Sequence, residues 1–259
     1  MKWNAVAALL LLMHPRGTQA ADLRPATVQA FDHYIQQTEQ RLNARKVFLW
    51  ADESADRNRR VKNGEVVVEP TGSKPVIDVT DGLIHDWVGA VFLPGINLAA
   101  TLEHIQDYDH ARTLHREVVD SRILAHSGND FRVYMRLLKK KVITVVLDTE
   151  HDIHYFPIDA THCRSQSRTT KIAEVDNPGK ANERELPPGT GHGFLWRLDT
   201  YWRFQERDGG TWIECQAISL TRDIPTGLGW LIEPIIRSLP RESLENTLRE
   251  TAAAFAKPR

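Results

Sequence analysis

The stretch TRDIPTGLGWLIEPIIRSLPRESLENTL, residues 221–248, decides how the rest of the chain is interpreted, because it is apolar yet broken by glycine and proline. Apolar residues recur there at helical spacing on both sides of Pro240. They are Leu228, Ile232, Ile235 and Leu239 before it, and Leu244, Leu248, Ala252 and Phe255 after it. Ser238 can cap the second half, and Pro234 lies inside the first half, where a proline bends a helix. The stretch therefore predicts a long, kinked helix with one apolar face.

The region before this helix has the pattern of a run of strands. Residues 85–95 are β-branched and aromatic and end on a Pro-Gly turn, and residues 97–115 predict one or two short helices with Asn97 as the N-cap. From 118 to 223, short turns separate strand-like segments, which is typical of an antiparallel meander. A curved antiparallel sheet must cover its apolar concave face, and only the C-terminal helix is long enough to do so. We therefore predict an α+β fold, a curved antiparallel sheet wrapped around a long kinked C-terminal helix.

The chain of 259 residues is long enough for one large domain with an extension. An amphipathic helix is predicted over 25–49, and the highly charged segment 51–63 is interpreted as a loop before a short strand. We predict three parts. They are a signal peptide (1–20), an N-terminal extension with a helix, a charged loop and a short strand (21–80), and the sheet-and-helix domain (81–259).

The first twenty residues have the pattern of a secretory signal. Lys2 precedes an uncharged run from Ala5 to Met13, and Pro15 and Gly17 stand before a small-residue site that ends at Ala20. This run is too short to cross a bilayer, which takes about 20 residues. We expect a mature chain that begins near Ala21 and is exported, to a bacterial periplasm, without stable membrane insertion.

Charge and motifs narrow the function classes. The 33 Lys and Arg residues balance 34 Asp and Glu residues, so nothing favours binding to nucleic acid. His104, Asp107 and His110 share a helical spacing, but the paired cysteines or H-E-x-x-H pattern of a zinc site do not occur. Neither do a P-loop, a G-x-S-x-G elbow or a dinucleotide-binding glycine pattern. We expect no metal and no cofactor.

Several segments of the chain, taken together, resemble those of a known family. They are GAVFLPG (89–95), QDYDH (106–110), RVYMRL (132–137), TEHDIHYFPID (149–159), YWRFQERDGGTWIECQAISL (201–220) and the opening stretch. In this order they are similar to the START-like superfamily, also called SRPBCC or helix-grip, which includes polyketide cyclase/dehydrase and lipid-transport proteins. The resemblance covers roughly residues 85–256. It implies a hydrophobic ligand held between sheet and helix, and it carries over no catalytic motif.

Strand alternation sorts the side chains that face the predicted cavity, because successive residues of a strand point to opposite faces. The inward set mixes apolar walls with hydroxyls and one histidine, and buried polar groups need partners, water or a ligand. We predict ligand-binding roles for Thr149, His151, Tyr155, Ser165, Ser167, Thr169, Trp196, Thr200, Trp202, Cys215, Trp230 and Ile235. Any one of them could instead be ordinary core. On the outward face, Arg203 and Glu214 are expected to form an exposed pair worth about 0.2–1 kcal/mol.

The two cysteines of the predicted mature chain, Cys163 and Cys215, fall on strands with one strand between them. Neighbouring strands lie 4.7–4.9 Å apart, so the two would be about 10 Å apart, beyond the reach of a disulfide. We predict two free, buried thiols.

Three functions remain open from the sequence. The first is an exported protein that binds a lipid or other hydrophobic small molecule. The second is a cyclase- or hydrolase-type enzyme in the same cavity, with His151 and Tyr155 as the weak candidates for acid–base catalysis, or with a serine. The third is a structural or partner-binding protein with a closed core, which would have no cavity.

Overall fold

The computed structural model describes residues 22–140, 144–223 and 229–256, and within 229–237 it describes the backbone only. The predicted signal peptide (1–20) lies outside these residues. Within these ranges, ten strands form the sheet, in the order β1-β3-β10-β9-β7-β6-β5-β4, with β2 on β3 and β8 on β7, and every pair is antiparallel. The strands are β1 (Val67–Pro70), β2 (Val76–Val79), β3 (Gly82–Pro94), β4 (Val118–Ser127), β5 (Asp130–Lys140), β6 (Thr144–Pro157), β7 (His162–Asp176), β8 (Arg184–Glu185), β9 (Arg197–Arg207) and β10 (Gly210–Arg222).

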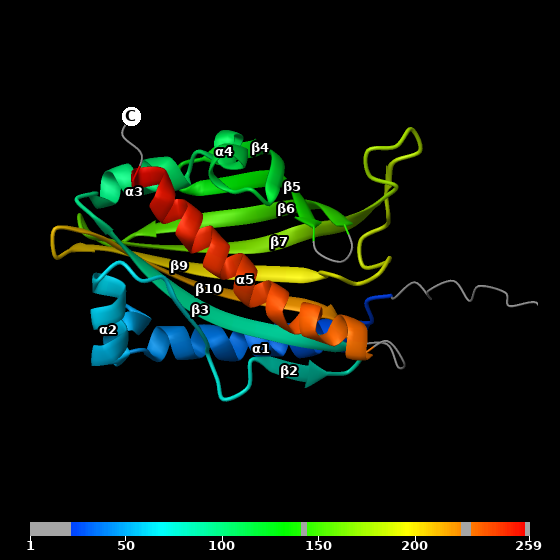
Figure 1. The fold of residues 1–259 in the computed structure, drawn as a ribbon, viewed down its shortest axis with the longest axis horizontal. Helices are drawn as coiled ribbons and strands as arrows, with labels where there is room; N and C mark the ends of the chain where they lie inside the picture. The colour runs from blue at the N-terminus through cyan, green and yellow to red at the C-terminus, as the bar shows by residue number, and fades with distance from the viewer. Residues whose placement is uncertain (1–21, 141–143, 224–228, 257–259) are drawn as a thin grey trace, which may run out of the picture.

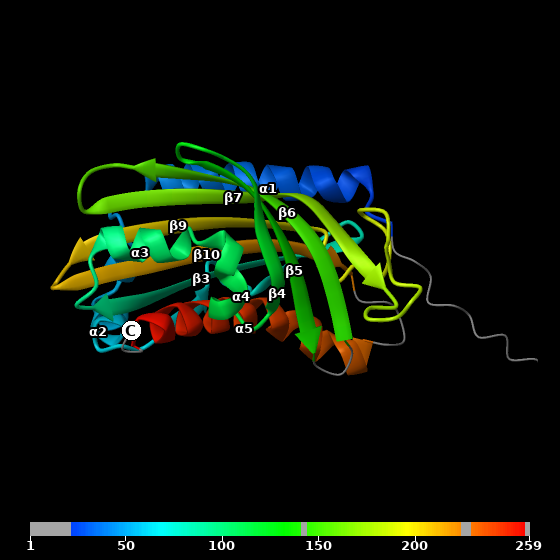
Figure 2. The ribbon, with the colours of Figure 1, turned by 90° about the horizontal axis from the view of Figure 1, so that it is seen from above.

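The long C-terminal helix α5 (Gly229–Ala256) lies across the concave face of this sheet, as Figures 1 and 2 show. It continues as one helix through Pro234 and Pro240, so Ser238 does not begin a separate helix. Of the side chains described in this helix, Leu244 and Leu248 are buried in the main core. The predicted α+β helix-grip architecture is therefore confirmed.

Short helices connect β3 to β4 and lie over one end of the concave face. They are α3 (Leu98–Ile105), the 3-10 turn η2 (Tyr108–His110) and α4 (Ala111–Leu114). Asn97 caps α3, because its side-chain oxygen accepts a hydrogen bond from the amide of Ala100 at 2.8 Å. The predicted pair of short helices with this N-cap is confirmed.

The N-terminal segment covers the opposite, convex face. Helix α1 (Pro25–Ala44) lies on the other side of the sheet from α5 in Figure 2, and Phe31 and Ile35 bury their side chains against it. The prediction of a charged loop over 51–63 is wrong. That segment forms a 3-10 turn, η1 (Trp50–Glu53), and a helix, α2 (Ala55–Lys62).

Long-range contacts explain why a segment so charged is helical. Ser54 caps α2, Val61 is fully buried, and Arg57 and Lys62 pair with Glu69 and Asp208. Tertiary partners thus override the polar composition, as they commonly do.

The expected exposed pair of Arg203 and Glu214 is also wrong, because the N-terminal segment buries both. The Glu214 carboxylate accepts hydrogen bonds from Arg45 at 2.7 Å and from the amide of Trp50 at 2.5 Å. Arg203 instead donates to the carbonyl oxygens of Leu42 and Phe48. The two charges therefore anchor the connection after α1 to the sheet.

A glycine lets α5 approach the sheet. A Cβ at Gly89 of β3 would lie 2.7 Å from Leu248 Cδ1 of α5 and 2.9 Å from Val68 of β1. At this position α5 therefore packs directly against the backbone of β3. Cys163 and Cys215 are free and buried, with β9 between their strands, as predicted.

Adding a methyl group under the helix should be costly. We expect Gly89→Ala to destabilise the fold by about 1–3 kcal/mol, since Leu248 and the backbone of Val67 must move. Urea unfolding measures this, with Gly72→Ala as the control because nothing lies near its missing Cβ. A Gly89→Ala midpoint equal to the control would contradict the close approach.

Removing the partner of Glu214 should loosen the N-terminal segment. Arg45→Met leaves a buried carboxylate without its cation, so we expect a loss of about 3–5 kcal/mol in the free energy of unfolding. Arg24→Met is the matched control, since Arg24 and Asp81 are exposed and such pairs contribute about 0–1 kcal/mol. Equal effects of the two changes would refute the anchoring role.

Candidate functional site

A cavity of about 350 Å³ lies between the concave face and α5. Its walls are mostly apolar. They include Met135, Leu137, Leu147 and Ile153 from β5 and β6, Ile105 and Leu114 from α3 and α4, and Leu239 and Leu244 from α5. The cavity excludes the closed-core alternative.

Seven of the predicted site residues line this cavity. They are His151 and Tyr155 on β6, Ser165 and Ser167 on β7, Thr200 and Trp202 on β9, and Cys215 on β10. Ser219 and Thr221 add two more hydroxyls from β10. Alternation along the strands thus brings one imidazole and a row of hydroxyls to an otherwise apolar space.

The other predicted residues lie elsewhere. Trp196 is not on the inward face, because it sits in the bend before β9 and packs with Phe31 and Ile35 under α1. Thr169 is displaced by a bulge in the β6–β7 pairing, and its hydroxyl accepts from the amide of Leu198 at 3.0 Å. Trp230 and Ile235 have side chains outside the described residues.

Thr149 does not line the cavity, but it orients a residue that does. Its hydroxyl donates to the carbonyl oxygen of Met135 and lies 2.9 Å from His151 Nε2. Because the single hydroxyl proton is already used, Thr149 can only accept from His151. Nε2 therefore carries the proton of the neutral ring, and Nδ1 is left as a hydrogen-bond acceptor.

Burial keeps His151 neutral. Desolvation lowers the pKa of His151 from 6.5 to about 4. With no described residue bonded to Nδ1, the ring offers the cavity one acceptor and no charge.

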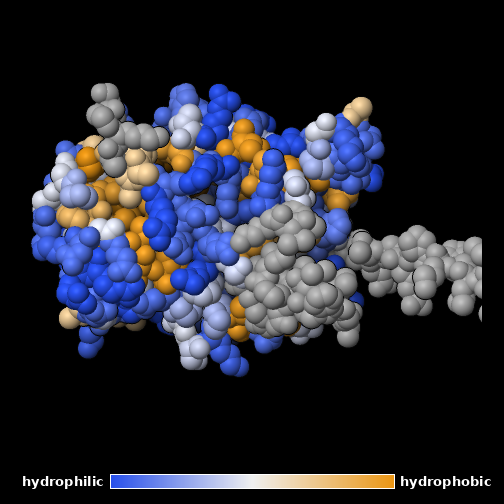
Figure 3. Space-filling model, in the orientation of Figure 1, coloured by the Kyte–Doolittle hydropathy of each residue, from blue (hydrophilic) through white to orange (hydrophobic). Residues whose placement is uncertain are grey.

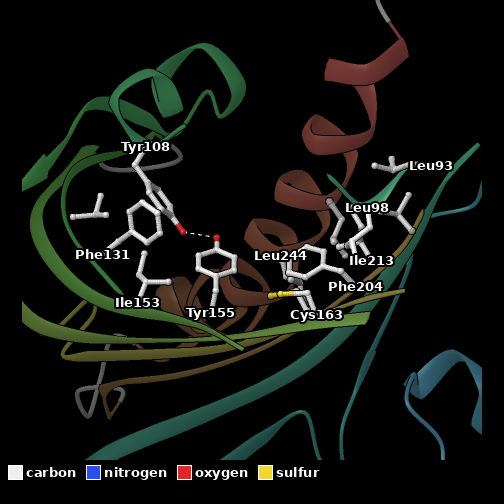
Figure 4. Packing of buried hydrophobic residues seen from close by; sticks show 14 of the residues in the cluster. Leu93, Leu98, Tyr108, Phe131, Ile153, Tyr155, Cys163, Phe204, Ile213 and Leu244 are labelled. Atoms are coloured by element: carbon white, nitrogen blue, oxygen red, sulfur yellow. Dashed lines mark hydrogen bonds between the residues drawn. The ribbon is translucent and has the colours of Figure 1, made fainter. Parts of the chain in front are cut away.

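A second buried polar pair lies at one end of the cavity. Figure 4 shows the hydroxyl of Tyr108, from η2, pointing to that of Tyr155 on β6, with an O–O distance of 2.7 Å. Phe131 packs edge-on against both rings. Burial raises the pKa of both tyrosines, so both are neutral. His151 and Tyr155 thus bond to different partners and do not form a hydrogen-bonded acid–base pair.

The cavity also has charged lining residues that the sequence pattern did not predict, among them Lys139 and Glu250. Lys139 of β5 contacts Glu117 and Ser243, and so ties the sheet to α5. On the same side, Glu250 of α5 pairs with Arg116 at 2.9 Å. Alternation along β5 could have identified Lys139, because Met135, Leu137 and Lys139 share one face of that strand and all three line the cavity.

No group of three His, Cys, Asp or Glu side chains suited to a metal ion occurs among the residues that the structure describes. Asp107 and His110 bond to each other at 2.8 Å. Within the same described ranges, no helix is long and apolar enough to cross a bilayer. The face seen in Figure 3 is largely hydrophilic, with small apolar patches.

The solved structures that are similar to this chain share little sequence identity with it. No protein-family model matches the chain, and a search of curated proteins finds no match. Among solved structures, a STAR-related lipid transfer protein from Xanthomonas axonopodis is similar with 14% identity and a TM-score of 0.46, over 71% of this chain and 100% of that one.

Two further structures are similar. A START superfamily protein from Mycobacterium smegmatis has 11% identity and a TM-score of 0.45, over 66% of this chain and 97% of that one. A Streptomyces aromatase/cyclase has 12% identity and a TM-score of 0.42, over 67% and 94%.

The neutral state of His151 should make stability depend on pH. Its pKa is 6.5 when unfolded and about 4 when folded, so the unfolded chain binds more protons between these values. Above pH 6.5, His151 is neutral in both states and does not lower the free energy of unfolding. As the pH falls to about 4, protonation of the unfolded chain lowers that free energy by about 3 kcal/mol.

Urea unfolding between pH 4 and pH 7.5 tests this. We expect His151→Gln to flatten the pH dependence, while His33→Gln, at an exposed position, leaves it unchanged. Identical profiles for wild type and His151→Gln would show that His151 is not buried and neutral.

Proposed function

We propose that this protein binds a lipid or other hydrophobic small molecule in the cavity between the sheet and α5. The observation that carries the proposal is the cavity itself, with its apolar walls and the few polar groups set among them. Small-molecule sites commonly have this composition and a volume of about 300–1,000 Å³. A core built only for packing would close such a space, since an empty cavity costs stability.

The polar groups define the ligand further. His151 offers an acceptor at Nδ1, and the hydroxyls of Ser165, Ser167 and Thr200 can donate or accept. An ionised group placed next to His151 would lose hydration without gaining a charge partner there. We therefore propose an uncharged hydroxyl or amide on the part of the ligand that reaches β6 and β7.

A binding role is favoured over catalysis by the same geometry. An acid–base catalyst needs a pKa near the working pH, whereas the pKa of His151 is lowered to about 4. The Tyr155 hydroxyl is engaged with Tyr108. Neither cavity residue has the paired partner that would activate it.

Export to a periplasm is part of the proposal and rests on the N-terminal sequence. N-terminal sequencing of the protein from fractionated cells tests this part by itself. A mature terminus near Ala21 is expected, and an intact Met1 would refute it.

Two measurements test the binding role. Organic extraction and native mass spectrometry of the purified protein should reveal a co-purified apolar molecule. Titration with the fluorescent apolar probe phenylnaphthylamine should show saturable binding that Ser167→Phe weakens by at least about 10-fold, since the added ring fills the cavity.

Matched variants separate binding from fold and from chemistry. Thr170→Phe, on the same strand but exposed, should leave the affinity unchanged. His151→Ala should retain probe binding. Binding that is absent in the wild type, or equal in Ser167→Phe and Thr170→Phe, would refute the proposal.

A further inference from the structure

A second, smaller cavity of about 180 Å³ lies on the convex side of the sheet, beneath the end of α1. Leu42 and Asn43 of α1 form one side, and Arg164, Gln166 and Arg203 of β7 and β9 line the other. No part of the proposed ligand site in the concave cavity explains these two arginines.

The two guanidinium groups lie on directly opposed residues. Arg164 and Arg203 are cross-strand partners in the β7–β9 register, an arrangement that is unfavourable for like charges. The nearest acid along this row, Glu214, is paired with Arg45. Among the described residues, no carboxylate lies within ion-pair distance of Arg164 or Arg203. In the described part of the chain, this row therefore has two guanidinium groups and one carboxylate, and that carboxylate already pairs with Arg45.

The two arginines differ in how their hydrogen-bond donors are used. Arg203 uses both terminal nitrogens on the carbonyl oxygens of Phe48 and Leu42, so it is fixed in place. Arg164 stacks near Phe156, with its guanidinium carbon 5.5 Å from the ring centre, and its Nε is buried without a partner. A buried, unpaired donor on a cation is costly, and an acceptor from outside the chain would remove that cost.

Glu39 also lines the cavity, but its charge is already compensated. Its Oε1 accepts hydrogen bonds from Gln166, Arg168 and Tyr201 at 2.5–2.8 Å. This cluster fixes the Glu39 side of the wall and leaves the Arg164 side free to bind.

We propose that this cavity is a binding site for a small oxyanion such as phosphate, held by the side chain of Arg164 and the charge of Arg203. Arginine is suited to this, because its planar donors match the oxygens of phosphate. The volume admits one such anion with a few waters, at about 30 Å³ for each water. The anion reaches the site either free in solution or as the headgroup of a lipid.

The test is a calorimetric titration of the full chain with inorganic phosphate. Saturable binding is expected, and Arg164→Gln should weaken it by about 10-fold or more, the effect of losing a hydrogen bond to a charged group. Arg132→Gln is the control, since Arg132 is exposed on β5 and faces Asp152. Phosphate should also raise the unfolding midpoint of the wild type and of Arg132→Gln, but not of Arg164→Gln.

A second arm separates the two sources of the anion. Vesicles of phosphatidylcholine with or without phosphatidic acid are floated with each variant. Binding to phosphatidic acid that needs Arg164 identifies a headgroup, and binding of free phosphate alone identifies a soluble anion, and either supports the site. No saturable binding in both arms, or binding that Arg164→Gln leaves unchanged, would overturn it. Arg203 is left intact, because its loss would release Leu42 and Phe48.

Discussion

The contact between α5 and β3 determines where a cavity can form between the helix and the sheet. Gly89 has no side chain, so Leu248 reaches the backbone of β3, and the helix is held near the β1–β3 side of the sheet. The strands from β9 to β5 then curve past the helix instead of lying flat beneath it (Figure 2). The cavity occupies the space that a single helix cannot fill. Its walls are therefore the inward faces of β5, β6, β7, β9 and β10, and the short helices before β4 cover one end.

The inward-facing residues of the cavity could be predicted from the sequence, because side chains alternate between the two faces wherever a strand is regular. His151 and Tyr155 on β6, and Ser165 and Ser167 on β7, face inward as the alternation requires. The prediction failed where regular pairing stops. A bulge displaces Thr169, and the bend before β9 turns Trp196 to the other face. Both failures are local changes of backbone path, which residue identity alone does not specify.

A different kind of failure concerns the N-terminal extension. Their charge predicts that Glu214 and Arg203 are exposed, yet Glu214 is 1% exposed and Arg203 is 7% exposed. Their partners are Arg45 and the carbonyl oxygens of Leu42 and Phe48, which are more than 150 residues away along the chain. Such long-range pairing cannot be predicted from a local sequence pattern. Composition gives only the average tendency of a charged residue to be exposed, and a specific long-range partner can overturn it.

The two cavities share the strand pair β7–β9, and this links the extension to the ligand site. Neighbouring residues along one strand point to opposite faces, and of this pair Arg164 lines the small cavity alone, while Ser165 also lines the large one. On β9, Arg203 lines the small cavity alone, while Trp202 also lines the large one. A sheet with one solvated face could not keep Arg203 buried and bonded to carbonyl oxygens. The N-terminal extension is thus what allows this sheet to carry polar, buried groups on both faces, and it fixes the outer side of the strands whose inner side forms the cavity.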